Sequence, residues 1–349
     1  MAASDNTFRV GITPDWGGER THEILGAALE EVFGPQPGIE HEMMPDTGET
    51  AVPEVIDRYD ALIVFGYYFP KESFQGVKRL ACLARWGVGY DRIDVEACTE
   101  ADVVLALTPN AVRRPVAEGI MALIFALAKN LRRLDIRTRE GRWRENLVCE
   151  SICVEGRTLG SVGVGSIAGE TFRIARGIGF GRLLGYDPYA DPKRAAELGV
   201  ELVDLDTVMR ESDFVAVNTF LSAETRGLVG ARELALMKPT AYLINTSRGP
   251  VIDEKALVEV LQQRRIAGAG LDVFEEEPPP KDHPLFALDN VILAPHSVAW
   301  TKESLRDNSL DACRNVRDVY EGKVPPHLAN PKVAGRPGLQ AKLAARRKS

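Results

Sequence analysis

Cysteine, histidine and long apolar runs are scarce in this chain of 349 residues, which has five cysteines and five histidines. The cysteines are odd in number and lack Cys-x-x-Cys spacing, which predicts reduced thiols, a cytoplasmic location and no bound metal. They are Cys82, Cys98, Cys149, Cys153 and Cys313. The most apolar run, residues 119–128, is too short to cross a bilayer, and the N-terminus has no signal-peptide pattern. We therefore expect no membrane partner.

The chain also lacks an excess of basic residues, with 43 Lys and Arg against 50 Asp and Glu and a net charge of −7. This balance argues against nucleic acid as a partner. Residues 129–144 are a local exception, with seven basic residues and two acids. A nucleic-acid patch is one explanation of this segment, and a solvated helix face or a subunit contact is the one we favour in an acidic chain.

Short apolar runs alternate with longer amphipathic ones along most of the chain, a pattern typical of α/β proteins with parallel sheets. With this length, about two such domains are expected. The strands predicted first are 9–13, 61–66, 80–85 and 103–107, with helices at 22–32 and 72–78. A long helix is predicted at 116–139, followed by strands at 161–165, 182–186, 214–217, 241–245, 269–273 and 291–294. Six strands after one turn motif would complete a doubly wound sheet.

The chain end is predicted as one helix, 302–320, followed by a tail from residue 323 that is rich in proline and glycine. We expect the helix to return to the first domain. The tail, which ends in Arg346-Arg347-Lys348, is expected to be extended or disordered, or to form an arm around a second subunit.

The strand predicted at 161–165 ends in a glycine-rich turn with the pattern Gly163-Val-Gly165-Ser-Ile-Ala168. Gly163 would permit the tight turn, Gly165 would let a pyrophosphate approach the backbone, and the following helix would present its positive end. Asp187 ends the next apolar run and is placed to bind a ribose 2′-hydroxyl, which favours NAD over NADP. A glycine-rich turn without a ligand is the alternative.

Four polar islands follow other predicted strands, where doubly wound sheets hold their ligands. They contain Arg248, Glu277, His296 and the turn 85–91, which includes Gly87-Val88-Gly89. Taken one at a time, each has a structural explanation. Arg248 could be a surface ion-pair partner, and Glu277 could lie in a solvated loop. His296 could be a strand-end histidine hydrogen-bonded to the backbone, and the glycine turn could be only a turn. Together they match ketone reduction, which needs a histidine acid, a carboxylate beside it and an arginine for a keto acid's carboxylate.

The islands RWGVGYDRIDV, PVAEGIMALIFALAKN, TLGSVGVGSIAGE, ETRGLVGARELALMKPTAYLINTSRGPVIDEKALVEVL, GLDVFEEEP and HPLFALDNVILAPH resemble the D-isomer-specific 2-hydroxyacid dehydrogenases. The resemblance covers about residues 8–325. It implies two doubly wound domains: a split flavodoxin-like substrate domain, residues 1–115 and 299–331, and a Rossmann NAD-binding domain, residues 116–298. Residues 332–349 would be a basic, flexible tail. It further implies a homodimer, which we expect to associate through residues 116–139.

The same resemblance implies the reaction and its residues. An NAD-dependent enzyme would interconvert a small 2-keto acid and a D-2-hydroxy acid, with hydride passing between the nicotinamide and the keto carbon. Arg248 would bind the substrate, and His296 would be the acid/base with Glu277 as its partner. Val88 and Gly89 would offer backbone donors to the substrate carboxylate. The remaining matches concern the cofactor: Asp272 at the nicotinamide carboxamide, with Gly163, Gly165, Ser166, Ile167, Asp187 and Thr246.

The sequence also departs from the family pattern. Ala168 stands at a position that is more often glycine, and Ser166 is shorter than the usual residue near the pyrophosphate. Trp300 would shape the substrate mouth or pack between the domains, and Tyr67 would line the pocket. Arg113 and Arg114 could bind a second anionic group, although a surface or interface pair is favoured.

Two other functions remain open at this point. One is oxidation of a one-atom or inorganic donor, as in formate and phosphite dehydrogenases of similar fold; the pairing of His296 with a glutamate argues against the formate enzyme. The other is an NAD-sensing corepressor-like binding protein, in which the same three residues can be intact.

Overall fold

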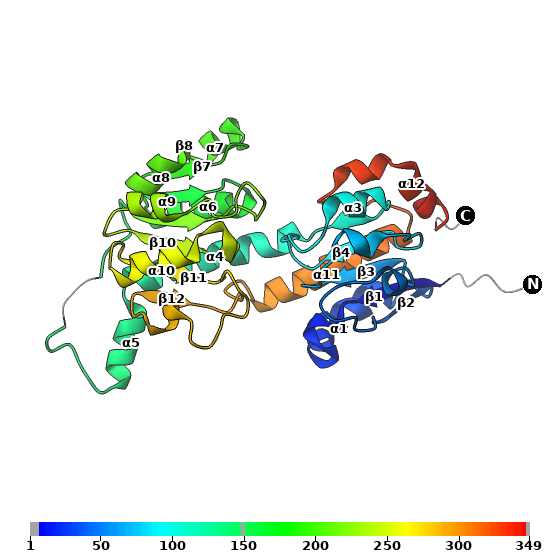
Figure 1. Cartoon of the computed structure of the whole chain (residues 1–349), viewed down its shortest axis with the longest axis horizontal. Coiled ribbons are helices and arrows are strands. Elements are labelled where there is room, and N and C mark those ends of the chain that lie inside the picture. Colours follow the sequence, from blue (N-terminus) through cyan, green and yellow to red (C-terminus); the bar gives the residue numbers. More distant parts are fainter. Residues whose placement is uncertain (1–6, 148–150, 347–349) are drawn as a thin grey trace, which may run out of the picture. The chain divides into compact units, whose positions relative to one another are not determined.

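The chain divides into two compact units in the computed structural model, which describes residues 7–147 and 151–346 (Figure 1). Unit 1 consists of residues 1–112 and 301–349, and unit 2 of residues 113–300. Cys149, Arg347 and Lys348 lie outside the described residues. Each unit is built on its own parallel sheet covered by helices. This is the α/β class expected from the alternation of the sequence.

Unit 1 contains a five-stranded parallel sheet in the order β2-β1-β3-β4-β5, the flavodoxin-like order. The strands are β1 (Phe8–Ile12), β2 (Ile39–Met43), β3 (Ala61–Val64), β4 (Cys82–Arg85) and β5 (Val104–Ala106). Alternate residues of β3 enter different cores: Ile63 packs with α1 (Gly18–Phe33) and α11 (Lys302–Tyr320), whereas Leu62 packs with α2 (Pro53–Ile56) and α3 (Val95–Glu100). The sheet is therefore covered on both faces.

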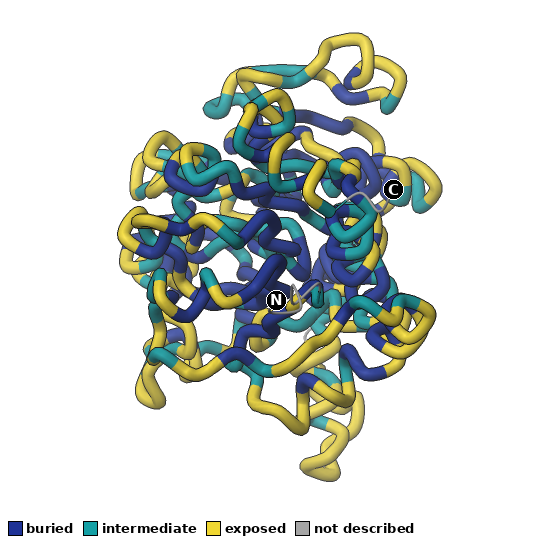
Figure 2. Tube along the Cα trace, turned by 90° about the vertical axis from the view of Figure 1, so that its right-hand side faces the viewer, coloured by how far each residue is buried: buried dark blue, intermediate teal, exposed yellow. Residues whose placement is uncertain are grey.

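Unit 2 contains a seven-stranded parallel sheet in the order β12-β11-β10-β9-β6-β7-β8. Its strands are β6 (Leu159–Val162), β7 (Leu183–Tyr186), β8 (Glu201–Leu202), β9 (Phe214–Val217), β10 (Tyr242–Asn245), β11 (Gly268–Leu271) and β12 (Val291–Leu293). The order reverses between β6 and β9, the switch point at which doubly wound sheets bind ligands. Figure 2 shows buried residues mainly in the interior and exposed residues mainly in the outer loops.

Helices cover both faces of this sheet because adjacent strand residues alternate between two cores. Val215 packs in the core with α8 (Leu205–Glu211), α9 (Ala231–Leu236) and α10 (Glu254–Gln262). Ala216, the next residue, packs in the core with α4 (Pro109–Ala128), α6 (Ser166–Ile178) and α7 (Pro192–Leu198). Short 3₁₀ turns complete the chain: η1 (Pro14–Trp16), η2 (Lys71–Phe74), η3 (Gly249–Val251), η4 (Pro284–Ala287) and η5 (Pro331–Gly335).

Three local predictions were wrong or incomplete. The helix expected at 72–78 is only the 3₁₀ turn η2. The helix expected at 116–139 is two helices, α4 and α5 (Leu131–Arg139), separated by Asn130 with φ 51°. The edge strands β2 and β8 were missed because β2 is polar and exposed and β8 has only two residues.

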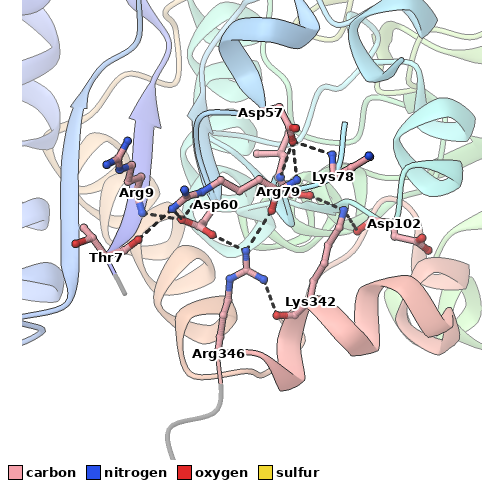
Figure 3. Close-up of polar contacts among 10 residues, drawn as sticks. Thr7, Arg9, Asp57, Asp60, Lys78, Arg79, Asp102, Lys342 and Arg346 are labelled. Atoms are coloured by element: carbon pink, nitrogen blue, oxygen red, sulfur yellow. Dashed lines mark hydrogen bonds and ion pairs between the residues drawn. The ribbon is translucent and has the colours of Figure 1, made fainter. Parts of the chain in front are cut away.

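The C-terminal tail corrects the expectation of an extended or disordered segment, because it folds onto unit 1 as η5 and α12 (Pro337–Ala344). Leu339 and Leu343, one helical turn apart, are buried in the unit 1 core. The Lys342 Nζ donates to the carbonyls of Leu80 at 2.7 Å and Ala101 at 2.8 Å. It also donates to the carbonyl of Asp102 at 3.2 Å (Figure 3). The proline and glycine content concealed this helix, which only tertiary contacts reveal.

An ion cluster continues the attachment of α12 (Figure 3). The Arg346 guanidinium donates to the Asp60 carboxylate at 2.5 Å, and the Arg79 guanidinium donates to the same carboxylate at 2.6 Å. Asp60 also accepts the backbone N–H of Arg9 at 2.8 Å. This one carboxylate thus joins the chain end to the starts of β1 and β3.

Candidate active site

The glycine-rich turn lies at the switch point of the unit 2 sheet, directly after β6. Gly163 has φ 97°, and a Cβ there would come within 2.8 Å of the Asn218 carbonyl carbon. Only glycine suits both the dihedral angle and the space. At Gly165, the N-cap of α6, an added Cβ would meet nothing within 4 Å. The protein therefore packs tightly against the turn at Gly163. At Gly165 the space beside the backbone is empty, and a pyrophosphate would approach there.

Asp187 follows β7 and is tied to the glycine-rich turn. Its carboxylate accepts the backbone N–H of Val164 at 2.9 Å and that of Tyr189 at 2.9 Å. The side chain remains half-buried, and a carboxylate has further lone pairs. Besides the ribose contact predicted for it, Asp187 thus braces the turn, a function that the sequence did not reveal.

The other predicted cofactor residues surround this turn. Ser166 is exposed and Ile167 half-buried in the first turn of α6, while Ala168 is buried against the sheet. Thr246 follows β10, and none of the described residues gives its buried hydroxyl oxygen a hydrogen-bond partner. A polar atom left in this state is usually satisfied by a ligand or water. The open face at Gly165 and the unpartnered Thr246 hydroxyl fit a dinucleotide.

Arg248 lies in a loop that the Asn245 side chain holds in place. The Asn245 amide donates to the Arg248 carbonyl at 2.9 Å, and its oxygen accepts the Ser247 N–H at 3.0 Å. A Cβ on the next residue, Gly249, would lie 1.9 Å from the carbonyl carbon of Phe274. Because that neighbour is backbone, only glycine allows the Arg248 loop to pack against the segment that leads to Glu277.

Glu277 and His296 form a hydrogen-bonded pair, with 2.7 Å between the Glu277 Oε2 and the His296 Nδ1. The other Glu277 oxygen accepts the Phe274 N–H at 3.1 Å. Burial alone would raise the pKa of Glu277, but the hydrogen bond and charge of His296, the Phe274 N–H and the Arg248 charge together hold that pKa below its usual range. Glu277 is therefore ionised at neutral pH and orients the imidazole, leaving Nε2 for chemistry.

The backbone of His296 is in the left-handed region, with φ 52°, which is unfavourable for a residue with a Cβ. Its N–H donates to the carbonyl of Asp272 at 2.7 Å. The Asp272 carboxylate accepts the backbone N–H groups of Ser297 at 2.8 Å and Val298 at 3.1 Å. Asp272 therefore holds the loop in the conformation that presents the imidazole.

Asp272 itself is buried at the end of β11. Burial raises the pKa of its carboxyl group, against the opposing effect of the Ser297 and Val298 amides and of His296. The nicotinamide contact expected for Asp272 stays a prediction. Its contact with the His296 loop was missed, since nothing in the sequence shows which backbone amides a carboxylate reaches.

Val88 and Gly89 lie in unit 1, half-buried in the turn after β4. The N–H of Gly87, the first glycine of this turn, donates to the Thr108 hydroxyl at 2.7 Å. That hydroxyl lies 2.6 Å from the Asn308 side-chain oxygen on α11. The turn is thus fixed to the segment after β5 and to α11.

Tyr67 is buried in unit 1, and its hydroxyl lies 2.9 Å from that of Thr47. Trp300, in unit 2, has 37% of its surface exposed. The Arg114 guanidinium is bonded to Glu118 at 2.6 Å and to Glu170 at 3.0 Å. These ion pairs favour the structural explanation of Arg114 over a second anion site.

Over residues 7–147 and 151–346, no group of three or more His, Cys, Asp or Glu side chains is arranged to hold a metal ion. In the same part of the chain, no helix has the length and apolar character needed to cross a membrane.

The family model that matches this chain covers most of unit 2. Residues 121–298 match the family model described as "D-isomer specific 2-hydroxyacid dehydrogenase, NAD binding domain". The chain is 40% identical over 265 residues to a glyoxylate reductase of Korarchaeum cryptofilum, covering 75% of this chain and 80% of that protein. It is 37% identical over 311 residues to a D-3-phosphoglycerate dehydrogenase of Methanocaldococcus jannaschii, covering 88% of this chain but only 58% of that longer protein.

Among solved structures, a glyoxylate reductase from Paecilomyes thermophila is similar with a TM-score of 0.79. The two are 27% identical, and the likeness covers 93% of this chain and 99% of that one. The fold of both units is therefore shared with an enzyme of known activity.

Proposed function

The chain belongs to the D-isomer-specific 2-hydroxyacid dehydrogenase family, and from this premise we propose how its residues act on the substrate. It is an NAD-dependent oxidoreductase that interconverts 2-keto acids and 2-hydroxy acids. Bound NADH supplies the hydride. The remaining steps, binding the carboxylate, polarising the keto group and moving one proton, belong to the protein.

The pair of Glu277 and His296 carries the proposal. His296 gives a proton to the keto oxygen during reduction and takes it back during oxidation. Glu277, ionised and 2.7 Å from Nδ1, fixes the orientation of the ring. Asp272 positions the loop through the Ser297 and Val298 amides, so it acts on the reaction through His296 as well as at the nicotinamide.

Arg248 binds the substrate carboxylate and polarises the keto oxygen, because its planar guanidinium matches a carboxylate. Val88 and Gly89 add backbone N–H groups to the same carboxylate, supported by the fixation of their turn on Thr108. Tyr67 and Trp300 are the other two residues that we propose contact the substrate. Gly163, Gly165, Ser166, Ile167 and Thr246 hold the dinucleotide, and Asp187 selects NAD by repelling a 2′-phosphate.

The substrate class is a small 2-keto acid, and glyoxylate is the first to test because the K. cryptofilum relative carries that name. NADH oxidation would be followed at 340 nm with glyoxylate, hydroxypyruvate, pyruvate and phosphohydroxypyruvate. We expect turnover with at least one of them, and none when phosphite or formate is offered with NAD. Tight NADH binding without turnover of any keto acid would instead indicate an NAD-sensing protein.

We further propose a cytoplasmic homodimer that associates through α5 and the segment after it. None of the residues of α5 is buried. This region exposes the large apolar side chains Leu131, Ile136, Trp143 and Leu147. Such a patch is typical of a protein interface. Sedimentation equilibrium of the purified protein and of Trp143→Ser tests it: we expect a dimer that weakens in the variant, whereas a monomeric parent contradicts the proposal.

A further inference from the structure

Unit 2 contains a cavity of about 360 Å³ at the edge of its sheet where strands begin. Asp213 precedes β9, and Tyr242 and Val291 open β10 and β12; all three line the cavity. The glycine-rich turn, Thr246 and Asp272 instead follow the ends of strands. A strand of four residues spans about 13 Å. The cavity is thus separated by the length of the strands from the residues proposed to bind NAD.

The walls of this cavity carry an excess of positive charge. Four arginines line it, Arg132, Arg133, Arg157 and Arg264, against two acids, Asp213 and Asp289. The chain as a whole has a net charge of −7, so this surface departs from the average of the molecule. A concave surface lined by one sign of charge concentrates the field and attracts the opposite ion.

The two acids do not neutralise the four arginines, because each of the two carboxylates interacts with two cations. Asp213 accepts the Lys238 Nζ at 2.9 Å and lies 4.0 Å from the Arg157 guanidinium. The hydrogen bond from Arg264 is the main cause that holds the pKa of Asp289 below its usual value, and the charge of Arg133 contributes. With Lys238 included, five cations face two carboxylates.

The floor of the cavity is apolar. Leu127 from the end of α4, Ile152, Tyr242 and Val291 contribute to it. Of these, Leu127, Tyr242 and Val291 are buried, and the Tyr242 ring stacks on Phe214 with 5.4 Å between centroids. A cationic rim over an apolar floor is suited to an anion that carries a small carbon body.

We propose that this cavity binds a small organic phosphate. A phosphate group has several oxygens that guanidinium groups bind in pairs, and its double charge matches the surplus of arginines. The apolar floor would take the carbon part of the ligand. This site is independent of the reaction, because it needs neither His296 nor Arg248, but it shares helix α5 with the surface proposed for the dimer through Arg132 and Arg133.

Calorimetric titration with phenyl phosphate tests the proposal on the full chain saturated with NADH, so that the cofactor turn is filled. We expect phenyl phosphate to bind, and inorganic phosphate to bind at least fivefold more weakly because it lacks the carbon body. Arg132→Glu should weaken phenyl phosphate at least tenfold. Arg139→Glu is the matched control, because Arg139 lies on the same helix, pairs with Asp135 and does not line the cavity.

Arg264→Gln offers a second variant on another wall of the cavity, with the same expected loss. The proposal is overturned if NADH abolishes the binding, since the anion then occupies the cofactor turn. It is also overturned if Arg132→Glu and Arg264→Gln bind as tightly as the parent, or if no heat of binding is found. Activity of the NADH-loaded enzyme is not the readout, so a failed dehydrogenase assay would leave this result untouched.

Discussion

At the scale of single residues, His296 combines an unfavourable backbone with an ordered side chain. A φ of 52° costs on the order of 1 kcal/mol or more for a residue with a Cβ, and the Asp272 carbonyl and the Glu277 carboxylate hold it there. Strain of this kind at the end of a strand is typical of functional positions. These two hydrogen bonds thus keep the His296 imidazole in its orientation although the backbone conformation of the residue is unfavourable.

Replacing His296 with Ala should lower kcat by about 10²–10⁴-fold, the usual contribution of a general acid. Dissociation of NADH, followed by its fluorescence, should change less than twofold, because none of the proposed pyrophosphate and ribose contacts involves His296. Turnover at the parent rate would refute the acid/base assignment.

Asp187→Asn tests cofactor selection more cleanly than removal of the whole side chain. The amide oxygen can still accept the Val164 N–H that Asp187 accepts at 2.9 Å, so the glycine-rich turn should keep this contact, whereas the bond from the Tyr189 N–H to the other carboxylate oxygen is lost. The negative charge that repels a 2′-phosphate is lost. We expect the ratio of kcat/KM for NADH over NADPH to fall by about tenfold, which corresponds to about 1.4 kcal/mol. A parent enzyme that already prefers NADPH would show that Asp187 does not select the cofactor.

At the scale of elements, helix α4 makes a close contact with the loop that bears His296. A Cβ on Gly119 would come within 2.7 Å of the Val298 Cγ1 and 3.3 Å of the Val298 carbonyl oxygen. Val298 donates its N–H to Asp272, so the helix and the carboxylate hold the loop from two sides. The packing of α4 thereby becomes part of the positioning of His296.

Gly119→Ala should therefore lower kcat by about tenfold with little change in NADH binding, because the added methyl group displaces the Val298 segment. Gly119→Ala combined with Val298→Ala removes the opposing methyl groups and should recover most of the loss. Steady-state kinetics of the two single variants and the double variant form the cycle. Full activity of Gly119→Ala, or no recovery in the double variant, would show that the contact does not position the loop.

The sequence predicts elements well where local pattern and burial agree. The helix expected at 302–320 is α11, which is amphipathic, and the strand expected at 214–217 is β9, a continuous apolar run of four buried residues. The polar edge strand β2 and the break at Asn130 have no such pattern. At the site, the sequence could place His296 and Glu277 after strands, but their 2.7 Å contact depends on the tertiary fold. The bond of Asp187 to the glycine-rich turn was equally hidden.

At the scale of the whole molecule, the chain end completes unit 1. Helix α12 covers the edge at which the unit 1 strands begin, and Lys342 bonds three carbonyls there. Burial is the main cause that lowers the pKa of Lys342 to about 8 from 10.5. The ammonium is therefore less favourable in the folded protein than in water, although its three donors are all used.

This shift predicts a pH dependence of stability. Between pH 8 and 10.5 the unfolded chain still binds the Lys342 proton while the folded chain has released it, so the free energy of unfolding rises with pH. Relative to Lys342→Met, the parent should gain about 1–2 kcal/mol over this range, after allowance for solvent screening of a partly exposed group. Urea unfolding at pH 7.5 and 10.5 measures the difference, with Lys332→Met, at an exposed site, as the control. A difference between parent and Lys342→Met that stays constant with pH would mean that Lys342 keeps its ordinary pKa and that its bonds to the three carbonyls offset the cost of burying the ammonium.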